Sequence, residues 1–496
     1  MLETKRGSQN KKNIIQLILM IVLTCFSQIL ALYKSRFTAI NFGATHYMDA
    51  YNFSVEIAAF VFSFVIGGVT TIIIPAYVKK TSSRAVNTFI TVTYACVLLL
   101  TLGVVIFRQP LLRLLTGRGI EFINIASDFL IISFIIQGVT AFLSVTLAYY
   151  QCEDKYNIPK VVVSAINMII LIVLLLGVVS DIYLYFLLLI AGSIINLVID
   201  VAIAFKLGFR YTFCLDIKNI EFKKMMAVFL PTVLSSGVYK LQTIVGTTIA
   251  TNLAEGQITI LGYASQIITV VNTVIIGNLT VYIYPKIVAN LKNKNVLRYF
   301  WDYCIFFHGV LAIIISGFIN IGSEGLSLLF LGGKFTLDNV NLLYLCSCIY
   351  IYGQQFNIIR DLIYRYFYAH GNTKETFKNS VVISLLNILL NFWLVKIWGI
   401  YGIVFGTVLA GFISLGMIII RFQNIFGLGV KFRYIVVEMG KNTLAMGGAV
   451  FFIQWLKTLL DISNVVLSIF VYGTGTVVIY LILILMLKTK MRHIKL

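Results

Sequence analysis

The chain contains a succession of fourteen apolar stretches, each close to the ~20 residues that an α-helix needs to cross the ~30 Å hydrocarbon core of a bilayer. Hydrophobic residues make up 59% of the chain and charged residues 12%, whereas soluble domains are roughly half apolar and a quarter charged. The alternation typical of an outer-membrane barrel is absent. We therefore predict an all-α polytopic membrane protein with about 14 transmembrane helices. The stretches are residues 14–33, 50–77, 87–107, 124–150, 158–179, 182–205, 225–251, 259–285, 299–320, 341–368, 378–395, 400–420, 434–456 and 463–487.

Two of these spans look like copies of one another. Each copy has a turn, an aromatic residue, a long apolar stretch and an exit proline: 41–44, Tyr51 and Pro75 in the first, and 252–256, Tyr263 and Pro285 in the second. The aromatic residue and the proline are 24 positions apart in the first copy and 22 in the second. Because six spans separate the copies, the repeats are parallel, a pattern found in transporters that close around a site between their halves.

The repeat predicts the organisation of the whole chain. Spans one to six form an N-terminal lobe over residues 1–205, and residues 206–224 form a cytoplasmic linker. Spans seven to twelve form a C-terminal lobe over residues 225–422, and two extra spans follow at 434–487. No connecting segment is long enough to be a soluble domain.

The net charge of +20 follows the predicted topology. With the N-terminus in the cytoplasm, the inside segments hold 27 of the 39 lysines and arginines, and the outside segments hold 8. This positive-inside bias places both termini of the multi-pass protein in the cytoplasm. We interpret the basicity as topology and attraction to anionic membrane lipids, and we expect no nucleic-acid partner.

Several kinds of chemistry have no motif in this chain. It has no Gly-x-x-x-x-Gly-Lys-[Ser/Thr] phosphate cradle and no His-Glu-x-x-His zinc motif, and its seven cysteines form no Cys-x-x-Cys pair. A membrane glycan polymerase or ligase would need a large external loop that carries acids and bases, and the external segments are short. We therefore expect a transporter rather than an enzyme, with no metal and no cofactor.

Basic residues inside or beside the spans point to an anionic ligand, because a charge near the bilayer centre costs at least ~2.5–3.5 kcal/mol. Lys240 lies 15 residues into the span that begins at Met225. Its stem can extend along a crevice to water, or its ammonium group can face a central cavity and bind an anionic headgroup. Lys34 and Arg36 lie at the outer end of the first span, where they are either interfacial anchors or further cations of the same site.

Two acidic residues open the second span. Asp49 and Glu56 are seven residues apart and therefore share one helix face. A carboxylate as deep as Glu56 needs a partner, and Lys34 or Arg36 on the adjoining span is the expected one. The acidic pair is either structural, or it gates the cavity and carries a coupling ion.

Further charges lie in spans ten and thirteen. Asp361 and Arg365 are spaced i,i+4 and are expected to form an intrahelical ion pair, which leaves Arg360 to bind phosphate through its planar guanidinium group. Glu438 and Lys441 are spaced i,i+3 and are expected to pair on a helix surface.

The motifs of spans one, two, seven and eight resemble those of the MurJ (MviN) lipid II flippase family, in the multidrug/oligosaccharidyl-lipid/polysaccharide (MOP) exporter superfamily. The resemblance rests on Phe26-Ser27-Gln28-Ile29-Leu30, Phe42-Gly43-Ala44, Asp49-Ala50-Tyr51, Leu230-Pro231, Gly262-Tyr263-Ala264 and Tyr284-Pro285. It implies a MATE-like fold of two six-helix lobes with spans one, two, seven and eight lining a cationic cavity. Two extra C-terminal helices form a groove for the lipid tail.

The resemblance also implies a substrate and a cycle. Alternating access would carry an undecaprenyl-pyrophosphate-linked oligosaccharide from the inner to the outer face, driven by membrane potential, Na+ or H+. Gln28 and Gln266 occupy positions where the family has arginines, and Lys34 occupies the position of another family arginine. These changes suggest an altered headgroup, so a polysaccharide repeat unit is as compatible with the sequence as lipid II. Glycan-synthesis enzymes are candidate partners. The predicted headgroup residues are Lys34, Arg36, Lys240, Gln266 and Arg360, with Asp49 and Glu56 in gating or ion coupling.

Other functions remain open at this point. A MATE-type drug/cation antiporter would need a dominant carboxylate in a largely apolar cavity, and here cations outnumber acids in the spans expected to line it. A membrane glycan polymerase or ligase and a structural scaffold are further alternatives. The intramembrane charges favour the flippase over all three.

Overall fold

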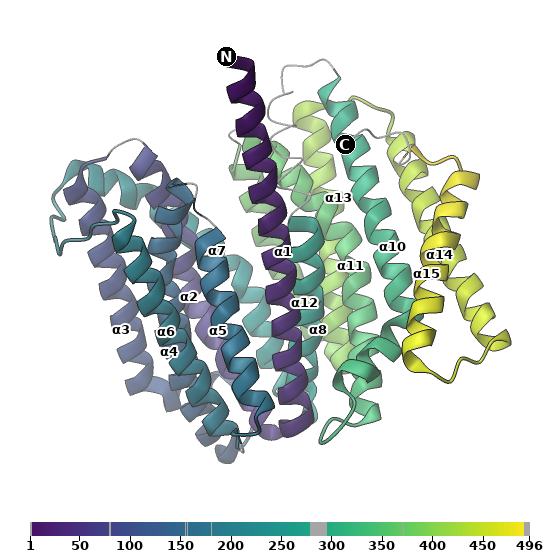
Figure 1. Ribbon diagram of the computed structural model, residues 1–496, viewed down its shortest axis with the longest axis horizontal. Helices are drawn as coiled ribbons and strands as arrows, with labels where there is room; N and C mark the ends of the chain where they lie inside the picture. The colour runs from purple at the N-terminus through teal and green to yellow at the C-terminus, as the bar shows by residue number, and fades with distance from the viewer. Residues whose placement is uncertain are drawn as a thin grey trace. The chain divides into compact units, whose positions relative to one another are not determined.

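The computed structural model describes residues 2–78, 81–153, 155, 157–179, 181–277, 295–370 and 372–490 as a succession of long helices (Figure 1). Apart from an isolated bridge between Gly332 and Phe335, these residues contain no β-structure. The first eight α-helices are α1 (Leu2–Phe42), α2 (His46–Val78), α3 (Ser83–Leu115), α4 (Ile120–Cys152), α5 (Asn157–Leu175), α6 (Ile182–Lys206), α7 (Ile220–Ala250) and α8 (Gln257–Val271). The π-helix η1 (Asn272–Gly277) follows, and then α10 (Val296–Phe330), α11 (Leu337–Ala369), α12 (Lys374–Trp398), α13 (Ile400–Phe426), α14 (Phe432–Leu459) and α15 (Val465–Met486).

Each predicted apolar stretch coincides with one of these α-helices. The eighth stretch continues from α8 and η1 into residues 278–285, so its exit Pro285 lies outside the described residues. Eleven described helices are long and apolar enough to cross a membrane, and α7, α8 and α14 fall outside that criterion. The all-α multi-pass architecture is confirmed, and the count of 14 spans is not.

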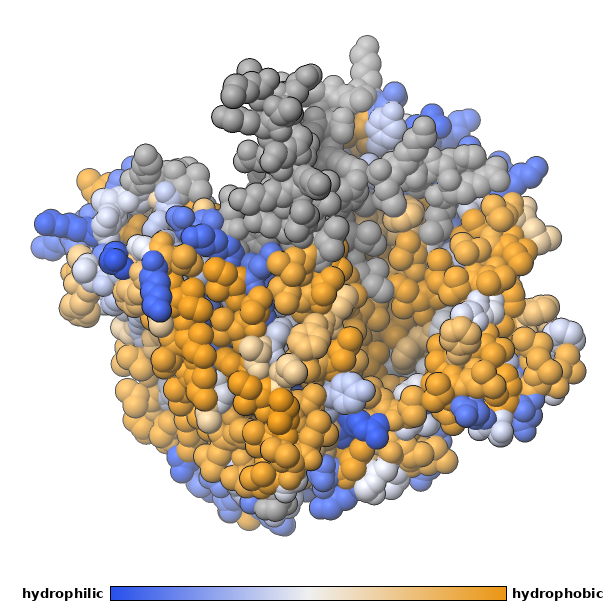
Figure 2. Space-filling model, viewed as in Figure 1, coloured by the Kyte–Doolittle hydropathy of each residue, from blue (hydrophilic) through white to orange (hydrophobic). Residues whose placement is uncertain are grey.

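Helix surfaces show how the chain meets a bilayer. On α15, one face is buried and the opposite face exposes large apolar side chains at helical spacing. The exposed set is Val466, Phe470, Val477, Leu481 and Leu485. Figure 2 shows broad apolar fields of this kind on the helices, with hydrophilic residues gathered near helix ends. Lipid, rather than water, is the medium that these faces match.

The chain divides into two compact units. The first comprises Met1–Thr38 and Ala44–Thr259, and the second comprises Ala39–Gly43 and Ile260–Leu496. The predicted lobes placed residues 225–251 in the second half, whereas here α7 packs against α2 and belongs to the first unit. The lobe boundaries themselves stay a prediction.

Two glycines bring α2 and α7 close together in the first unit. A Cβ on Gly237 of α7 would lie 2.1 Å from the Phe64 ring, and a Cβ on Gly68 of α2 would lie 2.4 Å from the Phe229 ring. Each glycine therefore receives an aromatic ring from the other helix. Beside this contact, the Ser82 N–H that precedes α3 donates to Glu221 Oε2 in the first turn of α7 at 2.9 Å. Small residues at helix crossings permit this approach of the backbones.

The turn glycines of the repeat share one backbone conformation. Gly43 has a φ of +71° and Gly256 a φ of +84°, a region that glycine enters at little cost and that other residues rarely enter. Gly43 follows α1, and Gly256 directly precedes α8. This shared geometry supports the predicted duplication.

In the second unit, a buried asparagine ties the C-terminal helices to α10. Asn320 donates to Thr476 of α15 at 2.9 Å and accepts from Gln454 of α14 at 3.2 Å. Lys457 of α14 forms an ion pair with Glu324 of α10. The two extra helices therefore have a specific polar attachment to the rest of their unit.

Candidate functional site

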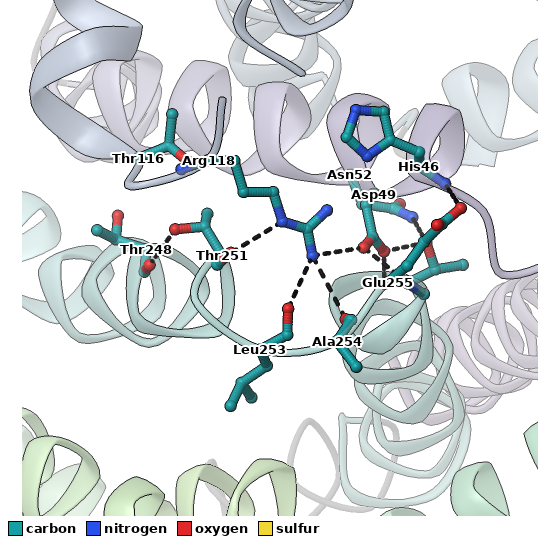
Figure 3. Close-up of polar contacts among 12 residues, drawn as sticks. His46, Asp49, Asn52, Thr116, Arg118, Thr248, Thr251, Leu253, Ala254 and Glu255 are labelled. Carbon is teal, nitrogen blue, oxygen red and sulfur yellow. Dashed lines mark hydrogen bonds and ion pairs between the residues drawn. The ribbon is translucent and has the colours of Figure 1, made fainter. Parts of the chain in front are cut away.

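The Asp49 carboxylate lies in the first turn of α2 and is fully buried. Its Oδ2 accepts the backbone N–H of Gly256 at 2.8 Å, and its Oδ1 accepts the N–H of Thr259 at 2.9 Å and the Thr259 hydroxyl at 2.8 Å (Figure 3). The first N–H groups of a helix have no partner within it, and negative charge is favourable at that end. Asp49 therefore caps α8 from a different helix.

Arg118 neutralises this carboxylate from the connection between α3 and α4. Its Nη2 lies 3.0 Å from Asp49 Oδ2. Its Nε donates to the carbonyl of Thr251 at 2.8 Å, and Nη2 is 3.4 Å from the carbonyls of both Leu253 and Ala254 (Figure 3). One guanidinium group thus fastens the whole α7–α8 connection and satisfies the carboxylate.

The same connection has two further constraints. Glu255 Oε1 accepts the His46 N–H at 2.7 Å, just before α2 continues to Asp49. A Cβ on Gly256 would lie 2.4 Å from the carbonyl oxygen of Ala44, so the backbone approach requires glycine. We name the set Asp49, Arg118, Gly256 and Thr259 the Asp49 latch. It holds the start of α2, the α3–α4 connection and the start of α8 together.

Lys34 lies on α1 beside α5. Its Nζ donates to Asn167 Oδ1 at 2.7 Å. Within the described part of the chain, no acidic side chain lies within ion-pair distance of Lys34. A half-buried ammonium group with only a neutral amide partner is costly in a membrane, so it suits an anionic ligand.

Two other polar contacts join α1 to α5. The hydroxyls of Ser27 and Ser164 are 2.6 Å apart, and Lys160 Nζ donates to Thr24 Oγ1 at 2.9 Å. The two helices are therefore held in register by three polar pairs, one of which contains the predicted headgroup residue Lys34.

The partner of Glu56 stays a prediction. The sequence indicates Lys34 or Arg36, and the Lys34 Nζ donates to Asn167. Because α2 packs closely on α7, Lys240 of α7 is a further candidate partner for Glu56.

The remaining predicted headgroup residues divide between the units. Arg36 is half-buried on α1 in the first unit, and Gln266 is half-buried on α8 in the second. Arg360 is buried on α11 in the second unit, beside the Tyr364 ring. Lys34, Arg36 and Lys240 therefore share one unit, whereas Gln266 and Arg360 share the other.

Two predicted ion pairs can be compared with the structure. Asp361 pairs with Arg360 at 3.3 Å, so Arg360 has a carboxylate beside it, which the i,i+4 spacing of Asp361 and Arg365 did not indicate. The Glu438–Lys441 pair is confirmed at 2.7 Å, but Glu438 is buried rather than on a helix surface. Its second oxygen accepts the Lys490 N–H after α15.

Metal binding has no support in the part of the chain that the structure describes. No three His, Cys, Asp or Glu side chains there lie close enough together to hold an ion.

Three candidate functional residues were not predicted from the sequence: Arg118, Asn167 and Asp200 of α6. A carboxylate inside an apolar stretch is itself a signal for function, and it could have identified Asp200. The Asp49–Arg118 and Lys34–Asn167 pairs join residues far apart in the chain, and spacing could not have found them.

Comparisons with known proteins agree with this architecture. The model of the family described as lipid II flippase MurJ matches residues 38–483. A probable lipid II flippase MurJ of Rickettsia prowazekii is 22% identical over 417 residues, covering 81% of this chain and 82% of that protein. A probable lipid II flippase MurJ of Helicobacter pylori is 26% identical over 242 residues, covering 48% of this chain and 52% of that protein. The chain thus spans about half the length of the Helicobacter relative.

Solved structures share the fold. A lipid II flippase MurJ in an inward closed conformation superposes with a TM-score of 0.80 at 21% identity, covering 94% of this chain and 98% of the other. An inward-facing multidrug resistance MATE transporter of the MOP superfamily has a TM-score of 0.64 at 13% identity, covering 82% and 97%. The family model spans most of the sequence, and the fold agrees with it. The chain belongs to the lipid II flippase MurJ family.

Proposed function

We propose that this protein is a flippase that carries an undecaprenyl-pyrophosphate-linked oligosaccharide from the inner to the outer face of the bacterial cytoplasmic membrane. The observation that carries the proposal is Lys34, a half-buried intramembrane cation whose ammonium group has a neutral amide, Asn167, as its partner. A pyrophosphate would supply the missing negative charge and accept strong charge-assisted hydrogen bonds. The names of the family and of its relatives support the same substrate class.

We propose that Lys34, Arg36 and Lys240 of the first unit bind the headgroup, and we also propose headgroup binding for Gln266 and Arg360 of the second unit. Lys240 and Glu56 lie on α7 and α2, which pack together, so headgroup binding would compete with this acid for the ammonium group. Arg360 has a carboxylate beside it in Asp361, and the same competition applies there. Without substrate, the two acids would partly neutralise Lys240 and Arg360. When substrate binds, its pyrophosphate would replace the acids as the partner of these basic side chains.

The Asp49 latch is the proposed gate. Its carboxylate holds the first turn of α8, and Arg118 holds the α7–α8 connection. Breaking these contacts frees the start of α8 from α2 without unfolding either helix. Alternating access then requires the latch to close in one state and to open in another, with both termini in the cytoplasm.

Membrane potential, Na+ or H+ is the proposed driving force, because a flippase without an ATP cradle needs another source of free energy. Membrane lipids surround the exposed apolar helix faces, and glycan-synthesis enzymes are candidate partners that would supply the lipid-linked glycan. Lipid II and a polysaccharide repeat unit share the pyrophosphate that Lys34 would recognise. They differ in the sugars.

Complementation of a bacterial strain depleted of its own lipid II flippase tests the proposal. Wild type is expected to restore growth, Lys34→Gln is expected to fail, and Lys160→Gln is the matched control because it also removes a lysine between α1 and α5. Failure of a correctly inserted wild-type protein would favour a polysaccharide repeat unit. Equal rescue by wild type and Lys34→Gln would contradict the cation-based site.

A further inference from the structure

Asp200 on α6 is a buried carboxyl group outside the headgroup residues and the Asp49 latch. It is 3% exposed and lies six residues before the end of α6 at Lys206. None of the ion pairs among the described residues includes it. Its Oδ1 is buried and has no hydrogen-bond partner. An ionised carboxylate in these surroundings would be a desolvated, uncompensated charge.

The hydrogen-bond distances around Asp200 fit a neutral carboxylic acid. Thr146 Oγ1 of α4 is 2.7 Å from Asp200 Oδ2 and 3.0 Å from the carbonyl oxygen of Leu143. A threonine hydroxyl has one hydrogen and two acceptor lone pairs, so it cannot donate to both oxygens. If Asp200 is a carboxylic acid, its own O–H donates to Thr146, and Thr146 donates to Leu143. Both contacts are then hydrogen bonds.

Among the residues that the structure describes, no cation forms an ion pair with Asp200 that would stabilise its ionised form. From α4, the titratable neighbour that interacts with it electrostatically is Tyr150, whose hydroxyl donates to the Asp200 backbone carbonyl at 2.7 Å. From α5, Lys160 directs its ammonium group to Thr24 of α1. Lys206, at the end of α6, is exposed.

We propose that Asp200 is a proton-binding site, which holds a carboxylic acid against Thr146 in the structure described here and releases the proton to water when α4 and α6 separate. The proton comes from bulk water on binding and returns to it on release, so no other reactant is needed. If Asp200 ionised while α4 and α6 remained packed together, one carboxylate oxygen would accept a hydrogen bond from the Thr146 hydroxyl. The other oxygen would remain without a hydrogen-bond partner. Ionisation therefore favours the separated arrangement.

The α4–α6 contact is connected to α2. Tyr149 of α4 donates its hydroxyl to the Leu207 carbonyl at the end of α6 at 2.9 Å. Its ring packs edge-on against Tyr77 of α2, with centroids 5.8 Å apart. Since α2 also carries Asp49, a proton at Asp200 can bias the helix that holds the latch. This coupling rests on the proposed flippase function, whereas proton binding itself does not.

Infrared difference spectroscopy of the purified protein at stepped pH tests the site. Wild type is expected to show the carbonyl stretch of a protonated carboxylic acid, and Asp200→Asn is expected to lose it. Asp181→Asn is the matched control, because Asp181 caps the other end of the same helix and is exposed. Should Asp200→Asn fail to fold, Thr146→Val still tests the site, since loss of the hydroxyl should shift the band.

Identical bands in wild type, Asp200→Asn and Thr146→Val, or no such band at any pH, would overturn the proposal. The spectra do not depend on lipid transport, so they would stand even if the protein moved no glycolipid. If glycolipid does move in reconstituted vesicles, its pH dependence should be flattened in Asp200→Asn and retained in Asp181→Asn. An unchanged pH profile in Asp200→Asn would disprove the coupling while leaving the flippase proposal intact.

Discussion

Arg118 Nη2 lies 3.0 Å from Asp49 Oδ2, and the two side chains are 12% and 0% exposed. Both oxygens of this carboxylate accept hydrogen bonds from Gly256 or Thr259 at the start of α8, and the Nε and Nη2 of Arg118 contact carbonyls of the α7–α8 connection. Because the pair is buried, removing one member leaves the other charge without compensation. The latch is therefore a point where a single substitution should have a large effect.

Asp49→Ala and Arg118→Ala should each lower the free energy of unfolding by about 3–5 kcal/mol, the usual cost of breaking a buried pair. The double variant should cost clearly less than the two single variants together, because it leaves no orphaned charge. Thermal unfolding of the purified proteins in detergent measures all three. Strictly additive losses would show that the two residues act independently.

Gly256→Ala should destabilise the latch, because alanine disfavours a φ of +84° by roughly 1–2 kcal/mol and its Cβ would meet the Ala44 carbonyl. Gly119→Ala is the control, since it lies beside Arg118 and a Cβ there meets nothing within 4 Å. Thermal unfolding should separate the two variants. Similar midpoints would mean that the turn tolerates a side chain.

Gly237→Ala should push α7 away from α2, because the new Cβ would lie 2.1 Å from the Phe64 ring. The expected loss is about 1–3 kcal/mol, as for other overpacked contacts. Adding Phe64→Leu should restore part of the loss. Crosslinking between cysteines on α2 and α7, together with thermal unfolding, tests the pair. No recovery in the double variant would argue against this contact.

Stability should depend on pH through Glu221. Hydrogen bonds from the side chain and the backbone N–H of Ser82 lower the pKa of this exposed carboxyl group. A pKa that is lower in the folded state stabilises the protein above the unfolded value of about 4.3, and the effect disappears as the pH falls through the folded pKa. At about pH 7, wild type should therefore unfold at a higher temperature than Glu221→Gln. The difference between the two unfolding temperatures should disappear below about pH 4. A difference that persists in acid would contradict this assignment.

The succession of helices was predictable because bilayer thickness imposes a length on each apolar stretch. Every predicted stretch contains a helix among the residues that the structure describes, and the turn glycines Gly43 and Gly256 share their backbone geometry. Which charged residues form ion pairs was not predictable. Asp361 has basic residues on either side, and the spacing with Arg365 did not indicate its ion pair with Arg360.

In the candidate site, too, some features were predictable from the sequence and others were not. The type and approximate depth of Lys34, Lys240 and Asp49 follow from their positions in the apolar stretches. Their partners depend on which helices lie side by side, and a pair such as Asp49 with Arg118 has no local signal. Asp200 did have one, because a carboxylate inside an apolar stretch needs an explanation wherever it occurs.

The central claim is that Lys34 binds an anionic lipid headgroup during transport. The most direct measurement is translocation of a fluorescent undecaprenyl-pyrophosphate-linked oligosaccharide in vesicles that contain the purified protein. Wild type and Lys160→Gln should move the lipid at similar rates, and Lys34→Gln should be about 10- to 100-fold slower, as expected for losing a hydrogen bond to a charged group. Transport by Lys34→Gln at the wild-type rate, or no transport by wild type under an imposed membrane potential and ion gradients, would contradict the claim.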